Sequence, residues 1–185
     1  MATVEELVNR LTDLEQNYRP SGEVTEHIKL VSAVLLMGAV GVGKSTVIKH
    51  VAELDSEFSN PGGLTTRESR STDAKTYRHI PHTPQGLTSI LDQVEAGDLV
   101  QYKVHPSLKN VYGSEASDYT TPFTILDTMA SAVDQIRGAG FKKVSEIALV
   151  TNPAQYVVQL VQRYGKGIYS WNVKNRLKES EDSLV

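Results

Sequence analysis

The 185-residue sequence predicts an α/β fold in which helices cover both faces of a parallel sheet. Short continuous apolar runs at 30–37, 121–127 and 144–151 have the length and composition of buried parallel strands. Segments with helical periodicity separate these runs, and a glycine-rich loop joins the first run to a helix. Strands that alternate with helices imply a parallel sheet with right-handed crossovers. The length suits one domain with a small insertion.

The composition narrows the classes of partner. The chain is 39% hydrophobic and 22% charged, with a net charge of −3, which gives no overall attraction to nucleic acid or to an anionic membrane. No apolar stretch approaches the roughly 20 residues of a membrane span, and the acidic N-terminus lacks the pattern of a signal peptide. The absence of cysteine excludes disulfides and thiolate sites. We therefore expect a cytoplasmic protein, monomeric or homodimeric, with a small-molecule substrate.

The first segment, "TVEELVNRLTDLEQNY", predicts an amphipathic helix that ends at "RPSG". Thr3 and Glu6 have the spacing of a capping box. A heptad fragment this short docks on its own domain more often than it dimerises, and we expect it to cover an exposed edge of the sheet. The residues that share its apolar face are Val4, Leu7, Leu11 and Leu14.

The segment "VLLMGAVGVGKSTVI" fits the phosphate-loop pattern G-x-x-x-x-G-K-[ST] between a strand and the helix predicted at 44–54. Its glycines allow positive φ, so that backbone N–H groups form a nest for an anion. Lys44 can reach the β and γ phosphates of a nucleotide, and the Ser45 hydroxyl can ligate Mg²⁺. The helix N-terminus adds a favourable dipole. The sequence thus predicts a three-layer P-loop NTPase fold with ATP and Mg²⁺ as cofactors, and the cofactor-binding residues are Gly38, Gly41, Val42, Gly43, Lys44, Ser45 and Thr46.

Further elements are predicted downstream. Strands at 76–81 and 99–104 flank a helix at 83–98, in which Pro84 suits the first position and Gly97 the C-terminal stop. Helices are also predicted at 129–140 and 152–165. The last residue of "FTILD", Asp127, lies at a strand end, where a carboxylate needs a cation or hydrogen-bond donors. Asp127 is expected to hold a Mg²⁺-bound water or a substrate group, or alternatively to cap the following helix.

A polar stretch, "TTRESRSTDAKTY", contains two arginines three positions apart and then Tyr77. Arginine side chains bind phosphate oxygens in a bidentate manner, so Arg67 and Arg70 are candidates for a second anion site. The alternative is that both arginines are ordinary solvated surface residues. A second anion site would suit an enzyme that transfers a phosphoryl group to a phosphorylated acceptor.

From about residue 33 to 178 the chain resembles the guanylate kinase family, whose members contain a "TTRxPR" stretch, then a tyrosine, then a "YG[ST]" turn. The equivalents here are "TTRESR", Tyr77 and "YGS" at 112–114. The resemblance implies a small inserted domain that binds the nucleoside monophosphate. It also implies a basic lid in which Arg163 and Arg176 stabilise the charge of the transferring group. Alternatively, Arg176 is an ordinary basic residue.

The resemblance assigns the remaining roles. The implied catalytic residues are Lys44, Arg67, Arg163 and Arg176. The implied substrate-binding residues are Arg67, Arg70, Tyr77, Gln101, Tyr112, Ser114 and Asp127. The implied segments are an N-terminal helix and lead-in at 1–32, a guanylate kinase-like domain at 33–178 and a tail at 179–185. Within that domain the core spans 33–62 and 120–178, the acceptor-binding subdomain about 63–119 and the lid about 163–176.

Several departures from the family pattern affect the acceptor. Family members read guanine with a glutamate where this chain has Gln101, and glutamine cannot accept two N–H bonds in the same fork. Gly63 and Met129 also replace a serine and an acidic residue of the family pattern. The predicted function is transfer of the γ-phosphate of ATP to GMP. The alternatives are another nucleoside monophosphate or a sugar phosphate as acceptor, or a non-catalytic binding module of the same fold.

Overall fold

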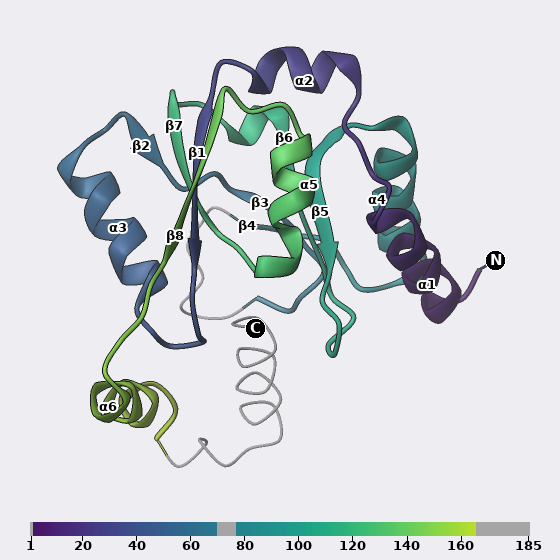
Figure 1. The fold of residues 1–185 in the computed structure, drawn as a ribbon. Helices are drawn as coiled ribbons and strands as arrows, with labels where there is room; N and C mark the ends of the chain where they lie inside the picture. The colour runs from purple at the N-terminus through teal and green to yellow at the C-terminus, as the bar shows by residue number, and fades with distance from the viewer. Residues whose placement is uncertain (1, 70–76, 166–185) are drawn as a thin grey trace.

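The structure, a computed structural model, describes residues 2–69 and 77–165, so the candidate residues Arg70 and Arg176 lie outside the described residues. Four strands form a parallel sheet in the order β2-β7-β1-β8 (Figure 1). Their bounds are β1 (Ser32–Met37), β2 (Phe58–Ser59), β7 (Phe123–Asp127) and β8 (Lys143–Ala148). Each neighbouring pair is parallel. The predicted α/β class with a parallel sheet is confirmed.

Helices cover both faces of this sheet because neighbouring residues of a strand point to opposite sides. On one face, Leu36 and Ile125 pack against α3 (Lys44–Leu54). On the other face, Leu35 and Leu126 pack with α2 (Gly22–Ile28) and α5 (Val133–Gly138). A short 3₁₀ turn, η2 (Ala130–Ala132), precedes α5. The two apolar clusters on the two faces are the core of the parallel layer.

A second sheet has the order β4-β3-β6-β5, with β3 and β4 parallel and the other two pairs antiparallel. It consists of β3 (Gly63–Thr65), β4 (Tyr77–His79), β5 (Leu99–Val104) and β6 (Val111–Glu115). The helices α1 (Val4–Glu15) and α4 (Pro84–Ala96) pack with it in one apolar cluster. The division of the chain into domains at residues 33, 63 and 120 stays a prediction.

The helix α1 begins with the predicted capping box at Thr3 and docks on its own chain, as predicted. The prediction that it covers an exposed edge of the parallel sheet is wrong, because its apolar face packs against α4 and β5 of the second sheet. The Tyr102 hydroxyl donates to the Leu11 carbonyl over 2.7 Å. The Glu15 carboxylate accepts from the Val104 N–H at 2.7 Å and forms an ion pair with Lys103.

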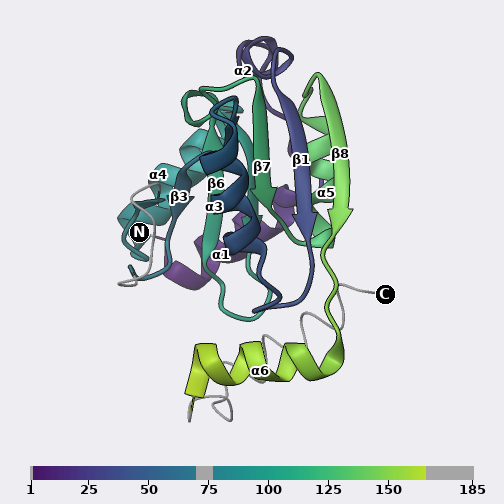
Figure 2. The same cartoon turned by 90° about the vertical axis from the view of Figure 1, so that its left-hand side faces the viewer.

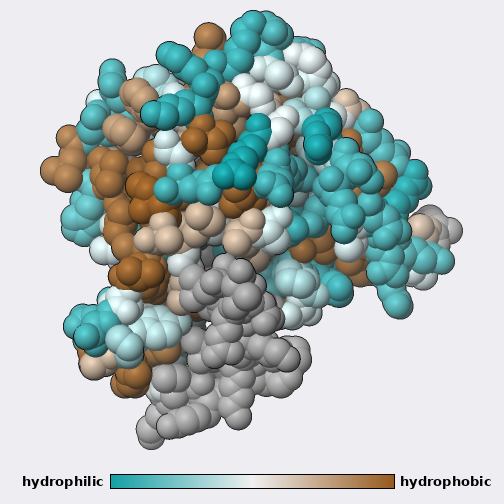
Figure 3. All heavy atoms as spheres, in the orientation of Figure 1, coloured by the Kyte–Doolittle hydropathy of each residue, from teal (hydrophilic) through white to brown (hydrophobic). Residues whose placement is uncertain are grey.

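Three sequence-based expectations need correction. The segment "RPSG", expected only to end the first helix, also starts the helix α2 at Gly22, with the Ser21 hydroxyl as its cap. The "YGS" segment, expected as a turn, lies within strand β6. The strand expected to be buried at 144–151 is largely exposed, with Ile147 and Val150 at 50% and 78% exposure. The strand β8 is the last in the strand order among the described strands, and apolar side chains gather on the surface over β8 and α3 (Figure 3).

The helix α6 (Pro153–Tyr164) lies beyond the carboxyl ends of β1 and β8, away from the helices that cover the sheet faces (Figure 2). Its start, capped by the Asn152 side chain with Pro153 in the first turn, agrees with the predicted helix. Within the described ranges, no helix has the combination of length and apolarity that a membrane span requires.

If α1 is part of the core, truncation of its central leucine will destabilise the whole fold. Leu11 is 0% exposed, so Leu11→Ala is expected to lower the free energy of unfolding by about 2–5 kcal/mol, the usual cost of such a cavity. The matched control is Leu54→Ala at a position that is 86% exposed, where we expect a change within about 0.5 kcal/mol. Urea unfolding measures both, and equal effects would contradict the packing described for α1.

Candidate active site

The candidate site lies at the carboxyl ends of β1 and β7, two neighbouring strands whose following helices pack on opposite faces of the sheet. The helix α3 follows β1 on one face of the sheet, and α5 follows β7 on the other face. In open α/β sheets, ligands bind at such a point, outside the carboxyl ends of the strands. The β1–β7 register pairs Leu36 with Asp127, so the glycine loop and this carboxylate emerge side by side.

The loop after β1 has the backbone that an anion nest needs. Gly38, Gly41 and Gly43 have φ values of 144°, 85° and 106°, in the region that disfavours side chains. A Cβ at Gly38 would also lie 2.5 Å from the Leu149 carbonyl oxygen, which closes the space for any other residue. The loop ends at α3, whose N-terminal dipole favours a bound anion.

Lys44 lies over this loop. Its Nζ donates to the carbonyl oxygens of Gly38 (2.6 Å) and Ala39 (3.2 Å), and it lies 3.7 Å from Asp127 Oδ1. Ser45 and Thr46 are exposed in the first turn of α3. A phosphate seated on the loop would therefore meet an ammonium, backbone N–H groups and hydroxyls, and these residues fit the triphosphate of a nucleotide.

Asp127 ends β7 with 42% of its side chain exposed. Desolvation by the surrounding protein raises the pKa of its carboxyl above the ordinary value, although the nearby Lys44 and Arg163 act in the opposite direction. The alternative that Asp127 caps the next helix is wrong, because Met129 precedes η2 and Ala132 precedes α5. The carboxylate faces the site instead, where desolvation penalises its charge.

A pocket of about 260 Å³ opens between the two sheets, beside the loop. Asp127 lines it from the parallel sheet, and four other sequence-predicted residues line it from the second sheet. Five predicted substrate residues thus surround one cavity: Tyr77, Gln101, Tyr112, Ser114 and Asp127. Pocket-lining residues that the sequence analysis missed include Asn60, Gly62, Lys103, His105 and Thr128.

Two of the missed residues could have been predicted from the alternation of side chains along a strand. Side chains at alternate positions of a strand share a face, so Lys103 and His105 lie on the same side of the chain as Gln101. The Nδ1 of His105 accepts the Leu108 N–H at 3.1 Å, which sets the orientation of the ring. Strand periodicity, applied after Gln101 was chosen, would have found both residues.

Gln101 has a defined partner within the pocket wall. Its Nε2 donates to Ser114 Oγ at 3.3 Å, and Ser114 Oγ lies 2.8 Å from the buried Tyr119 hydroxyl. Burial raises the pKa of Tyr119, so its hydroxyl stays protonated at neutral pH. The amide of Gln101 is therefore held at the cavity by a chain of hydrogen bonds.

The predicted arginines are only partly gathered at the site. Arg67 does not line the pocket; its guanidinium lies 5.7 Å from the centroid of the Tyr77 ring, a cation–π arrangement. Arg163, in the last turn of α6, is exposed but close enough to influence the pKa of Asp127. The structure leaves the positions of Arg70 and Arg176 undescribed.

The helix α6 meets the phosphate loop directly. The Tyr156 hydroxyl donates to the Val40 carbonyl over 2.9 Å, and a Cβ at Gly41 would lie 3.1 Å from Leu160 Cδ2. No sequence pattern predicted these contacts, because they join segments about a hundred residues apart.

The described residues contain no group of three or more His, Cys, Asp or Glu side chains that could hold a metal ion alone. Mg²⁺ usually binds through one or two protein oxygens together with substrate phosphates and water. The Ser45 hydroxyl at the loop is compatible with that role.

Comparison with known proteins gives little further information. No protein-family model matches the sequence, and no curated protein matches it. One matching solved structure is the crystal structure of guanylate kinase from Anaplasma phagocytophilum, with 12% identity over 85% of this chain and 73% of that chain. The TM-score of 0.36 is too low for this match to bear on the fold or the function.

The raised pKa of Asp127 predicts a pH-dependent stability. The native state holds the Asp127 proton more tightly than the unfolded state, whose pKa is near 3.8. The contribution of Asp127 to the free energy of unfolding therefore falls as pH rises from about 3.8 through the higher native pKa, and its ionised carboxylate destabilises the fold at neutral pH. Asp127→Asn is expected to be more stable than wild type near pH 7, with a smaller difference near pH 4. Urea unfolding at both pH values measures this, and a variant less stable than wild type at pH 7 would contradict it.

Proposed function

We propose that this protein is a guanylate kinase-like phosphotransferase that moves the γ-phosphate of ATP to a phosphorylated small molecule, most simply GMP. The observation that carries the proposal is the position of Asp127. It lies 3.7 Å from Lys44 of the phosphate loop, and it also lines the pocket that contains Gln101 and Ser114. A donor site and an acceptor site that share one residue are suited to direct transfer between two bound substrates.

On the donor side, the loop amides and Lys44 would hold the β and γ phosphates of ATP, and the Ser45 hydroxyl would ligate Mg²⁺. When bound, Mg²⁺ neutralises charge on the phosphate oxygens. Lys44 would remain with the γ-phosphoryl group during transfer, because its ammonium counters the charge that develops on the oxygens. Asp127 would hold Lys44 in place, or bind a substrate hydroxyl or a water.

On the acceptor side, Tyr77 and Tyr112 would donate to the monophosphate, while Gln101 and Ser114 would contact the base. Arg67 and Arg70 would supply the positive charge that a phosphate dianion requires. The reaction would be an in-line displacement: the acceptor phosphate oxygen attacks the γ-phosphorus, the bond to the β–γ bridging oxygen breaks, and ADP leaves.

The lid would consist of Arg163 and Arg176, which would stabilise charge on the moving group and exclude water. The influence of Arg163 on the pKa of Asp127 supports its proximity to the reacting atoms. Gly165, with a φ of 50°, directly follows α6 and would allow this segment to move.

A second acceptor class is favoured by Gln101. Its side chain, held by the hydrogen bond to Ser114, would present an amide to the base, where family members present a carboxylate. An acceptor with both a donor and an acceptor atom would satisfy this amide, so another nucleoside monophosphate or a sugar phosphate is the alternative substrate. A non-catalytic binding module is disfavoured, since it has no need for the phosphate-binding glycine loop and Lys44.

The first experiment measures ADP release from ATP·Mg²⁺ by the purified protein. GMP, dGMP, AMP, UMP, CMP and ribose 1,5-bisphosphate serve as separate acceptors. We expect turnover with GMP, and loss of at least about a hundredfold in Lys44→Ala, because one electrostatic stabiliser of the transition state typically contributes that much. Lys49→Ala, an exposed lysine one turn further along α3, is the matched control.

Turnover with another acceptor but not with GMP would identify that other acceptor as the substrate. ATP binding without ADP release for any acceptor would contradict the transferase and support the binding module.

The base-reading role of Gln101 is tested by Gln101→Glu. A carboxylate can accept two N–H bonds from guanine, so this variant is expected to lower KM for GMP by about tenfold relative to AMP, with KM for ATP unchanged. Gln85→Glu, a substitution of the same type at an exposed position of α4 outside the pocket, is the control. An unchanged acceptor profile in Gln101→Glu would show that this residue does not read the base.

A further inference from the structure

The strand β4 brings Tyr77 to the pocket, yet its backbone support is slight. It has three residues and is the last strand of the second sheet within the described part of the chain, where it pairs in parallel with β3 through the register Leu64–Arg78. Parallel pairing is less stable per residue than antiparallel pairing. Side-chain contacts must therefore contribute to the position of this strand.

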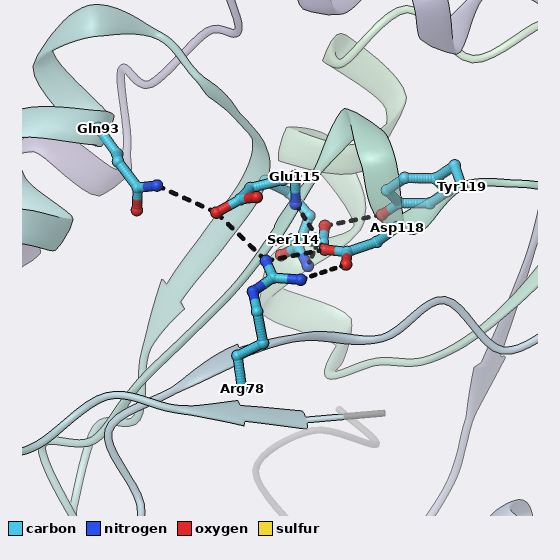
Figure 4. Close-up of polar contacts among 7 residues, drawn as sticks. Arg78, Gln93, Ser114, Glu115, Asp118 and Tyr119 are labelled. Atoms are coloured by element: carbon cyan, nitrogen blue, oxygen red, sulfur yellow. Dashed lines mark hydrogen bonds and ion pairs between the residues drawn. The ribbon is translucent and has the colours of Figure 1, made fainter. Parts of the chain in front are cut away.

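Arg78 supplies such contacts by reaching across β3 (Figure 4). Its Nη1 and Nη2 donate to the two carboxylate oxygens of Asp118 at 2.6 and 3.3 Å, and Nη2 lies 3.2 Å from Glu115 Oε1. Asp118 belongs to a short 3₁₀ turn, η1 (Ala116–Asp118), and its side chain is only 7% exposed. A bidentate arginine–carboxylate pair of this kind fixes direction as well as distance.

The partners of Arg78 are themselves held in place. Asp118 Oδ2 accepts the Glu115 N–H at 2.8 Å, and Glu115 Oε1 accepts from Gln93 Nε2 of α4 at 3.0 Å. The Asp118 carboxylate also raises the pKa of Arg78, so the guanidinium stays charged. The network thus joins β4 to β6, η1 and α4.

The same turn is joined to the other end of the pocket. Ser114 directly precedes Glu115, and Tyr119 directly follows Asp118. The Ser114 Oγ lies 2.8 Å from the Tyr119 hydroxyl. Ser114 Oγ in turn accepts from Gln101 Nε2. Arg78 itself does not line the pocket, whereas its neighbour Tyr77 does, as expected for adjacent residues of a strand.

We propose that Arg78 is a positioning residue whose ion pair with Asp118 fixes Tyr77, at the phosphate end of the acceptor pocket, relative to Gln101 and Ser114 at the base end. This inference rests on the proposed function of the pocket. Arg78 acts through the placement of β4 and makes no contact with the acceptor.

The test is Arg78→Met, which keeps the length of the side chain and removes the charge and the fork. With GMP as acceptor, KM for GMP is expected to rise about tenfold, while KM for ATP and kcat stay within about threefold of wild type. Arg78→Lys keeps the charge without the bidentate geometry, so its KM should lie between those of the wild type and Arg78→Met. The matched control is Arg137→Met: that arginine also bridges two carboxylates, Asp134 and Glu146, but its ion pairs join α5 to β8 and involve no residue of β4.

Amide hydrogen exchange gives a second readout that needs no turnover. The Ile80 N–H donates to the Thr65 carbonyl and reports the attachment of β4. Exchange over residues 77–80 is expected to be about tenfold faster in Arg78→Met and unchanged in Arg137→Met. If Arg78→Met does not fold, Asp118→Asn replaces it, because an asparagine keeps an oxygen for the Glu115 N–H and removes the charge.

The outcomes separate the two proposals. Faster exchange together with the selective rise in KM for GMP supports the positioning role. Unchanged exchange, or faster exchange with an unchanged KM for GMP, overturns it. If the wild type transfers phosphate to no acceptor, the proposed function fails on its own; exchange then decides whether Arg78 holds β4, and an unchanged rate still overturns the inference.

Discussion

The register between β1 and β7 is the constraint on which the candidate site depends. It pairs Leu36 with Asp127, and the phosphate loop starts at Gly38, two residues after Leu36. A shift of one residue would turn the Asp127 side chain to the opposite face of the sheet and exchange the environments of Ile125 and Leu126. Since those two side chains fill separate apolar clusters on the two faces, the core itself selects this register. Packing that is remote from the chemistry thus sets the approach of Lys44 to Asp127.

The ionised carboxylate of Asp127, at this edge of the sheet, lowers the stability of the fold. Asp127 has a raised pKa although Lys44 and Arg163 are near, so desolvation outweighs their attraction. Lys44 is held mainly by two carbonyl oxygens of its own loop. In the protein alone, the interactions of Asp127 do not offset the cost of desolvating its charge. Such local conflicts are expected at sites that bind charged ligands, where the ligand supplies the missing interactions.

The sequence predicted those features that local chemistry determines. The capping box at Thr3, the stop at Gly97 (φ 75°) and the positive φ values of the loop glycines each depend on residues within one turn. The strands β3 and β6 were missed, because each is stabilised by a partner far along the chain, such as Leu64 opposite Gly113. The contact of Tyr156 with Val40 could not be predicted from the sequence for the same reason. Lys103 and His105 could have been found by applying the strand period from Gln101.

The pocket is built across two sheets, so its geometry depends on whatever holds those sheets together. Gln135 of α5 belongs to the parallel layer, yet its side chain accepts the Tyr102 N–H of β5 (3.2 Å) and donates to the Glu15 carbonyl of α1 (3.1 Å). The Glu15 carboxylate binds the Val104 N–H and Lys103 of the same strand. In-line transfer is sensitive to misplacement of about 1 Å. The N-terminal helix, which contributes no residue to the pocket lining, therefore belongs to its scaffold, because it fixes the strand that carries Gln101 against the layer that carries Asp127.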